Sequence, residues 1–277
     1  MKAASFDYAV PKTLADATAM LGTANATTAA IAGGQSLLPM LNLRVAQPDI
    51  VVDLGHLKEL RDMSVTSDTI QIGALTTHAS IEDGLFADVF EGLLQKVASQ
   101  ISYRAIRHFG TIGGSVALAD PAADWPGCLM ALGATVRVSG QKGARTELIT
   151  KFVRGQYETS LAADEVIVSF DVPRPTARLR WGVHKVARKS GAFADSLAFA
   201  VSQGKGGPAS VVLAAAGARP HMLPKVIKEI TTDQTSDGAL RAAIAEDVAP
   251  LLPEGDDYLM RLHTSTVLRA VREMQSK

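Results

Sequence analysis

The sequence contains a single cysteine, Cys128, among its 277 residues. One thiol excludes a disulfide bond within the chain. It also excludes an iron–sulfur cluster or a zinc site built from several thiolates of this chain. If iron–sulfur chemistry takes part in the function, we expect another chain to hold the clusters.

The sequence also lacks an excess of charge, a long apolar run and paired histidines. Its 28 basic and 28 acidic residues balance, which excludes the electrostatic footprint of a nucleic-acid-binding protein. No window is apolar enough for a membrane span, and residues 1–17 lack the apolar core of a signal peptide, so we expect a cytoplasmic protein with no integral membrane segment. The six histidines form no HxH, HExxH or HxxxH pattern, so no metal site is predicted.

Helix-like and strand-like segments alternate from the beginning of the chain. Residues 11–22 have helical spacing, with Thr13 and Asp16 as a capping pair and Gly22 as a stop. Short β-rich runs at 27–33 and 49–55 flank a Gly-Gly segment. We therefore interpret residues 1–55 as a β-α-β unit, the first of three predicted domains.

Two further domains are predicted from the order of the remaining segments. Residues 56–175 contain expected strands at 68–77, 134–140 and 165–173, an expected helix at 87–101 and a second glycine segment at 110–125. The stretch VPRPTARLR (172–180), with two prolines and three arginines, indicates a boundary. Residues 178–277 then predict an antiparallel meander followed by helices at 237–249 and 256–274.

The two glycine segments share a plan that suits an anion. Residues 33–36 read Gly-Gly-Gln-Ser and residues 113–115 read Gly-Gly-Ser, about 80 residues later. Paired glycines allow successive N–H groups to face one concavity, while Thr111 and the two serines add hydroxyl groups, and a helix expected from Leu37 adds its dipole. Two such sites suit a bridging pyrophosphate, although each pair could equally be a tight turn. Neither segment matches the Rossmann fingerprint or the P-loop.

Longer stretches around these glycines carry a specific resemblance. AGGQSLLPMLNLR followed by PDIVVDL, and GTIGGSVALADPAADW preceded by IRH, resemble the two FAD-binding segments of the medium subunit of molybdenum hydroxylases. That family includes aerobic carbon monoxide dehydrogenase, xanthine dehydrogenase and N-heterocycle dehydrogenases. The segment HKVARKSGAFADSLAFAV (184–201) is similar to the part of the family that lies beside the flavin ring. The resemblance covers the whole chain.

The resemblance implies an α+β fold and a set of FAD-binding residues. Two subdomains would clasp FAD, and a C-terminal domain with a three-stranded antiparallel sheet and a helix bundle would follow. The glycine segments would hold the pyrophosphate, Asp124 would lie near the ribose or adenine end, Lys185 near the flavin or its ribityl chain, and Phe193 beside the isoalloxazine ring. The residues implied are Ala32, Gly33, Gly34, Gln35, Ser36, Leu37, Thr111, Ile112, Gly113, Gly114, Ser115, Asp124, Lys185 and Phe193.

The resemblance further implies an electron-transfer subunit without catalytic residues of its own. A large molybdopterin-binding subunit and a small subunit with [2Fe-2S] clusters would complete a dimer of heterotrimers. Two alternatives stay open: a stand-alone FAD-dependent oxidoreductase and a flavin-free assembly module. The chain departs from the family at His108-Phe109, where Asn-Arg is common, and at Gln35, where many members have histidine.

Overall fold

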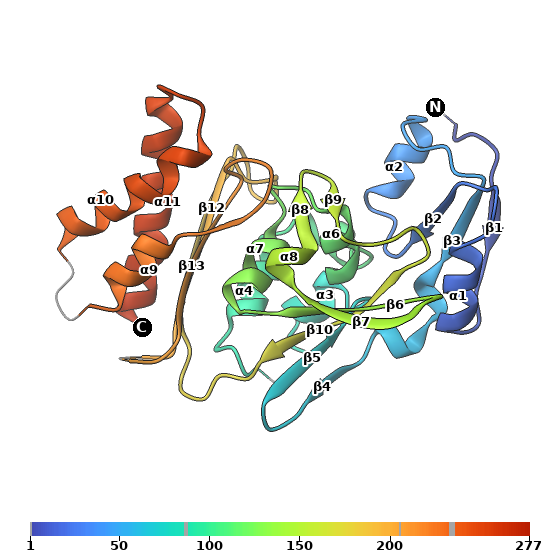
Figure 1. Ribbon diagram of the computed structural model, residues 1–277, viewed down its shortest axis with the longest axis horizontal. Coiled ribbons are helices and arrows are strands. Elements are labelled where there is room, and N and C mark those ends of the chain that lie inside the picture. Colours follow the sequence, from blue (N-terminus) through green and yellow to red (C-terminus); the bar gives the residue numbers. More distant parts are fainter. Residues whose placement is uncertain (1, 86–87, 205, 233–235) are drawn as a thin grey trace.

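The N-terminal part of the chain forms a small parallel sheet. The computed structural model describes residues 2–85, 88–204, 206–232 and 236–277. The three strands of this sheet lie in the order β1-β3-β2, and both pairs are parallel (Figure 1). The elements are β1 (Asp7–Ala9), α1 (Leu14–Leu21), β2 (Thr28–Ile31), α2 (Leu37–Asn42) and β3 (Ile50–Asp53). The expected strands at 27–33 and 49–55 are confirmed, as is the helix that begins at Leu37.

Helix α1 begins and ends where the sequence predicts. The backbone N–H of Asp16 donates to Thr13 Oγ1 at 3.1 Å, and the backbone N–H of Thr13 donates to Asp16 Oδ2 at 3.0 Å. Gly22 is the C-terminal cap. The predicted capping pair is therefore a complete capping box, in which each partner satisfies a backbone donor at the helix start.

The central part of the chain is built on a five-stranded antiparallel sheet in the order β4-β5-β10-β6-β7. Its strands confirm the runs expected at 68–77, 134–140 and 165–173. The strands are β4 (Met63–Val65), β5 (Thr69–Gly73), β6 (Thr135–Gly140), β7 (Gly143–Leu148) and β10 (Val166–Pro173). The helices and the short hairpin beside them are η1 (Leu54–His56), η2 (Lys58–Leu60), α3 (His78–Glu82), α4 (Leu93–Ser99), α5 (Arg104–Arg107), α6 (Ile112–Leu118), α7 (Asp124–Ala131), α8 (Ile149–Phe152), β8 (Val153–Gly155) and β9 (Glu158–Thr159).

The helix expected at 87–101 is shorter than predicted. Gly92 has a left-handed backbone with φ +80°, and Asp88 Oδ1 accepts hydrogen bonds from the N–H groups of Phe90 and Gly92. This local turn competes with helix formation, so α4 begins only at Leu93. Residue 87, the first of the expected helix, lies outside the described residues.

The C-terminal part of the chain is a four-stranded antiparallel sheet with helices on one face. Its order is β11-β12-β13-β14, so it has one strand more than the predicted three. The extra strand, β14, has only two residues and therefore no readable alternation. The elements are β11 (Arg180–Val186), β12 (Ser196–Ser202), β13 (Ala209–Ala214), β14 (His221–Met222), α9 (Pro224–Ile230), α10 (Asp237–Val248), η3 (Ala249–Leu251) and α11 (Asp257–Ser276).

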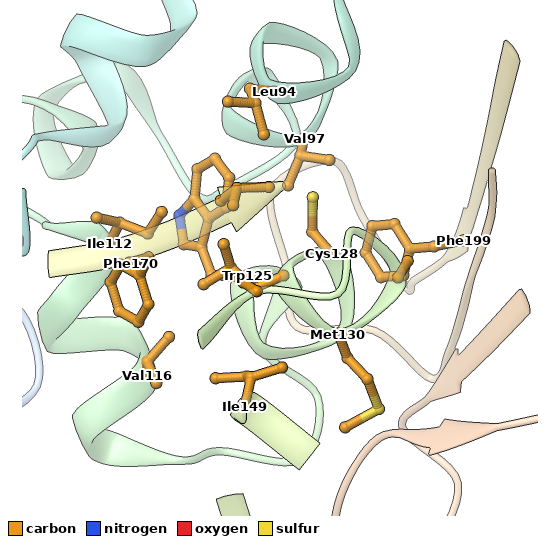
Figure 2. Close-up of a cluster of buried hydrophobic side chains, with 14 of the residues drawn as sticks. Leu94, Val97, Ile112, Val116, Trp125, Cys128, Met130, Ile149, Phe170 and Phe199 are labelled. Carbon is orange, nitrogen blue, oxygen red and sulfur yellow. The ribbon is translucent and has the colours of Figure 1, made fainter. Parts of the chain in front are cut away.

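Strand β12 separates two hydrophobic cores, because all seven of its residues are buried. Leu197, Phe199 and Val201 face the central core, which contains Trp125 (Figure 2). Ala198 and Ala200 face a second core, which is formed with α9, α10 and α11. These helices cover the opposite side of the sheet (Figure 1). The central and C-terminal parts therefore share one sheet as a wall. No helix in the described ranges is long and apolar enough to cross a membrane.

The contact between β11 and α11 gives a stability prediction at Gly182. A Cβ at this position would lie 2.0 Å from the carbonyl oxygen of Ala270 in α11. We expect Gly182→Ala to lower the free energy of unfolding by about 3 kcal/mol, since a backbone atom has to move. The control is Gly238→Ala in α10, where the nearest atom is 3.9 Å away and a neutral or slightly stabilising change is expected. Urea denaturation measures both, and equal midpoints would contradict the packing described.

Candidate functional site

A cavity of about 730 Å³ lies where the two glycine segments meet β11 and the loop that follows it. It is large enough for a sizeable small-molecule ligand. Every predicted site residue lines this cavity except Ile112, whose side chain is fully buried in the central core (Figure 2). Ile112 therefore packs the core beneath the cavity and presents no side chain to it.

The first glycine segment offers backbone donors. Gly34 has a left-handed backbone with φ +71°, which glycine adopts without strain. Among the hydrogen bonds of the described residues, the backbone N–H groups of Gly34, Gln35 and Ser36 have no acceptor. The Gln35 side chain folds back and donates to the carbonyl oxygen of Gly33 at 3.0 Å. Three consecutive N–H groups are thus available at the wall of the cavity.

The second glycine segment differs from this plan. Its backbone donors are used within the protein, because Gly113 N–H donates to the Ala74 carbonyl at 2.8 Å and Gly114 N–H donates to Thr111 Oγ1 at 3.1 Å. A Cβ on Gly113 would lie 2.6 Å from the Ala74 oxygen. The prediction of a second concavity of free glycine N–H groups is therefore wrong. Helix α6 begins here instead, and Thr111 and Ser115 line the cavity.

The backbone of the first segment touches the chain at Phe109 and Gly110, where the second segment begins. A Cβ on Gly33 would lie only 1.9 Å from the carbonyl oxygen of Phe109, so this approach requires glycine. The sequence at 108–109 differs from the Asn-Arg that is common in the family it resembles. The contact uses only the backbone of Phe109, so it does not depend on that difference. The Phe109 side chain is exposed, and it does not line the cavity.

Lys185 and Asp124 form one buried ion pair at the cavity wall. Lys185 Nζ lies 2.9 and 3.0 Å from the two carboxylate oxygens of Asp124 and 3.4 Å from the carbonyl oxygen of Gln100. Burial raises the pKa of Asp124, and the charge of Lys185 opposes this shift. The sequence prediction assigned the two residues to different ends of a ligand, whereas the structure brings them into contact at one point.

The mouth of the cavity carries aromatic and basic side chains. Phe193, in the loop between β11 and β12, and Tyr103 are both exposed. Lys189 Nζ lies 5.8 Å from the centre of the Tyr103 ring. The loop is attached to the segment before α5 by a hydrogen bond from Ser102 N–H to the carbonyl of Gly191, at 3.0 Å. Sequence reasoning identified Phe193 and missed Tyr103 and Lys189.

His78 is a further cavity residue that sequence reasoning missed. It is buried, and its Nδ1 accepts a hydrogen bond from Trp125 Nε1 at 3.0 Å. Burial, with a smaller effect of the Arg107 charge, lowers the pKa of His78 to about 4. The ring is therefore neutral at pH 7. In the sequence, His78 directly follows the strand expected at 68–77, a common place for a site residue. It belongs to none of the histidine patterns searched for, so it was not predicted as a site residue.

The lone thiol does not line this cavity. Cys128 is fully buried in α7, and burial raises the pKa of its thiol. Within the described ranges, no group of three or more histidine, cysteine, aspartate or glutamate side chains could hold a metal ion. The cavity instead offers hydrogen-bond donors and one buried ion pair.

Comparison with known proteins assigns this arrangement to a family. Residues 4–175 match the family described as the FAD binding domain in molybdopterin dehydrogenase. The chain belongs to this family. Its relatives are subunits of dehydrogenases and hydroxylases, so it is a subunit of an oxidoreductase, as predicted.

Individual relatives are similar over different lengths. The chain is 31% identical to the carbon monoxide dehydrogenase medium chain of Hydrogenophaga pseudoflava, with 96% of each chain covered. It is 38% identical to the nicotine 6-hydroxylase medium subunit of Paenarthrobacter nicotinovorans over 70% of this chain and 67% of that one. The match to caffeine dehydrogenase subunit beta of Pseudomonas sp. (strain CBB1) spans just under two thirds of that subunit, 66%.

Solved structures confirm the predicted fold. A chain of carbon monoxide dehydrogenase from Hydrogenophaga pseudoflava superimposes with a TM-score of 0.92 at 30% identity, covering 100% of this chain and 99% of that chain. A chain of quinoline 2-oxidoreductase from Pseudomonas putida 86 gives 0.85 at 30% identity, with 99% of both chains covered. The two-subdomain fold of the carbon monoxide dehydrogenase flavoprotein type, with its C-terminal sheet and helices, is therefore present.

The buried histidine predicts a pH-dependent stability. The unfolded state binds a proton on His78 below about pH 6.5, while the folded state resists protonation down to about pH 4. Stability is therefore lost as the pH falls from 6.5 to 4, by about 3 kcal/mol for this group. In His78→Asn, which keeps an acceptor for Trp125 but does not titrate, we expect a loss smaller by that amount. Urea denaturation at pH 7 and pH 4 compares the two proteins, and parallel losses would contradict a buried neutral His78.

Proposed function

We propose that the chain binds FAD in this cavity and serves as the electron-transfer subunit of a molybdenum-containing hydroxylase or dehydrogenase. The observation that carries the proposal is the row of three unpaired backbone N–H groups at Gly34, Gln35 and Ser36, set in a cavity lined by both glycine segments. Such a row suits the oxygens of a pyrophosphate without any lysine. The match to an FAD-binding domain family supports the same ligand.

The remaining cavity residues would hold the rest of the molecule. Thr111 and Ser115 would add hydroxyl donors opposite the first segment, and the exposed ring of Phe193 would border the isoalloxazine. Lys185 would lie near the flavin or ribityl chain together with Asp124. Since Asp124 neutralises much of the Lys185 charge, the pair would affect the flavin potential less than an unpaired cation.

Partner subunits would supply the chemistry that this chain lacks. FAD, when bound, provides a centre that accepts electrons and passes them in pairs to an external acceptor. With one buried cysteine, the chain has no thiolates for clusters, so the [2Fe-2S] centres would lie in a small subunit and the molybdenum cofactor in a large one. We propose a cytoplasmic dimer of heterotrimers, with the chain divided into domains at 1–55, 56–175 and 178–277.

Purification from the native host tests this function. We expect the protein to co-purify with two other subunits and with FAD, molybdenum and iron, measured by absorbance, flavin extraction and metal analysis. A lone flavin-containing chain that oxidises a substrate would instead support a stand-alone oxidoreductase. A complex without flavin, even after incubation with FAD, would support an assembly module.

A glycine variant tests the first segment. Gly34→Ala introduces a side chain at φ +71°, which costs about 1–2 kcal/mol, so the segment relaxes away from the arrangement that presents its N–H groups. FAD binding has to restore that arrangement, and we expect its Kd to rise about ten-fold. Titration of the deflavinated complex with FAD, followed by flavin fluorescence, gives the Kd.

Gly133→Ala is the matched control for this variant. Gly133 has φ +70°, a Cβ added there would meet no atom within 4 Å, and the residue does not line the cavity. The alanine therefore introduces the same backbone strain without touching the segment. A similar rise in Kd for both variants would show that backbone strain alone, and not the N–H groups of the first segment, changes FAD binding.

A further inference from the structure

The imidazole ring of His78 is held in one orientation by the surrounding structure. Trp125 lies among apolar side chains of the central core (Figure 2). It donates its indole N–H to His78 Nδ1 at 3.0 Å. The backbone N–H of His78 donates to the Gly110 carbonyl at 2.9 Å. A Cβ on Gly110 would lie 2.8 Å from both Cδ2 and Nε2, so glycine at this position leaves room for the opposite ring edge.

This orientation fixes where the ring carries its proton. A neutral imidazole has one N–H group, and because Nδ1 accepts from Trp125, the hydrogen lies on Nε2. Among the described residues, no hydrogen bond from Nε2 is found, although His78 is only 5% exposed. Nε2 is not among the fully buried atoms that lack a partner, so this donor keeps some exposed surface that a ligand can reach. His78 lines the cavity, so a ligand there can provide the missing acceptor.

The neighbouring segment has few other donors to offer. Gly110 is the first residue of the second glycine segment, whose N–H groups at Gly113 and Gly114 are already bonded within the protein. On this side of the cavity, a ligand oxygen would therefore meet hydroxyl groups and the Nε2–H of His78. The histidine provides the N–H donor that the glycines of this segment do not.

We propose that His78 donates its Nε2–H to an oxygen atom of FAD, and that Trp125 is a positioning residue that holds Nδ1 as the acceptor. This inference rests on the proposed function, since it requires FAD in the cavity. It assigns a cofactor contact to a residue outside both glycine segments and explains why a buried tryptophan directs its N–H at a histidine.

Two substitutions at His78 separate a donor from a structural role. His78→Asn keeps an acceptor near the position of Nδ1 for Trp125 and loses the donor toward the cavity. His78→Gln places an amide N–H near the position of Nε2 and loses the acceptor. In FAD titrations of the deflavinated complex, we expect Kd to rise about ten-fold for asparagine and less for glutamine.

A tryptophan pair tests the positioning role. Trp125→Phe removes the indole N–H, and we expect Kd to rise about three-fold because His78 can then adopt the other tautomer. In the double variant His78→Gln/Trp125→Phe, where no indole N–H is left without an acceptor, we expect affinity close to that of His78→Gln. The control is Trp181→Phe, because the Trp181 indole N–H donates to the Glu91 carbonyl at 2.7 Å and the residue does not line the cavity. Its Kd should not change.

The outcomes distinguish this inference from the proposed function. Wild-type affinity in His78→Asn, or tighter binding by asparagine than by glutamine, would overturn the donor role, because a structural histidine favours the variant that keeps the Trp125 bond. An equal loss of FAD affinity in Trp125→Phe and Trp181→Phe would overturn the positioning role of Trp125. Failure of the wild-type complex to bind FAD would overturn the proposed function and this inference with it. Urea midpoints of all variants identify losses that come from unfolding.

Discussion

The contact between the backbone of Gly33 and the carbonyl of Phe109 is the constraint on which the site depends. It brings the segment that follows strand β2 of the parallel sheet against the loop that precedes helix α6 in the antiparallel part of the chain. No side chain fits between them. Because the two backbones meet directly, residues from both sides of the contact line one cavity.

The two glycine segments have different chemistry even though their sequences look alike. After β2, no strand or helix takes up the N–H groups of residues 34–36, so they stay available. At Gly113 and Gly114 the chain is already helical, and the donors are used by a neighbouring loop and by the cap Thr111. The same residue pair thus provides donors in one place and close packing in the other. On the side of the second segment, the donors are therefore side chains: the hydroxyl groups of Thr111 and Ser115 and the imidazole of His78.

Burial sets the electrostatics of the cavity. Lys185 and Asp124 are both almost inaccessible to water, and pairing is what allows either charge to stay there. His78 is neutral for the same reason. Strand β12 makes this burial possible, because its two faces close the central core and the helix-covered core at once. The C-terminal part of the chain therefore completes the site with Lys185 and Phe193 as well as stabilising the fold.

Local sequence determined the elements and the family. The capping pair Thr13 and Asp16, the alternating strands and the two long glycine-containing stretches are short-range patterns, so they are readable without a structure. Tertiary structure alone decided which N–H groups are free, that Lys185 meets Asp124, and that His78 reaches the cavity. Those properties depend on residues that are distant in the sequence but close in space. The partners of the ion pair, for example, are 61 residues apart, and a local sequence pattern cannot show that two such residues meet.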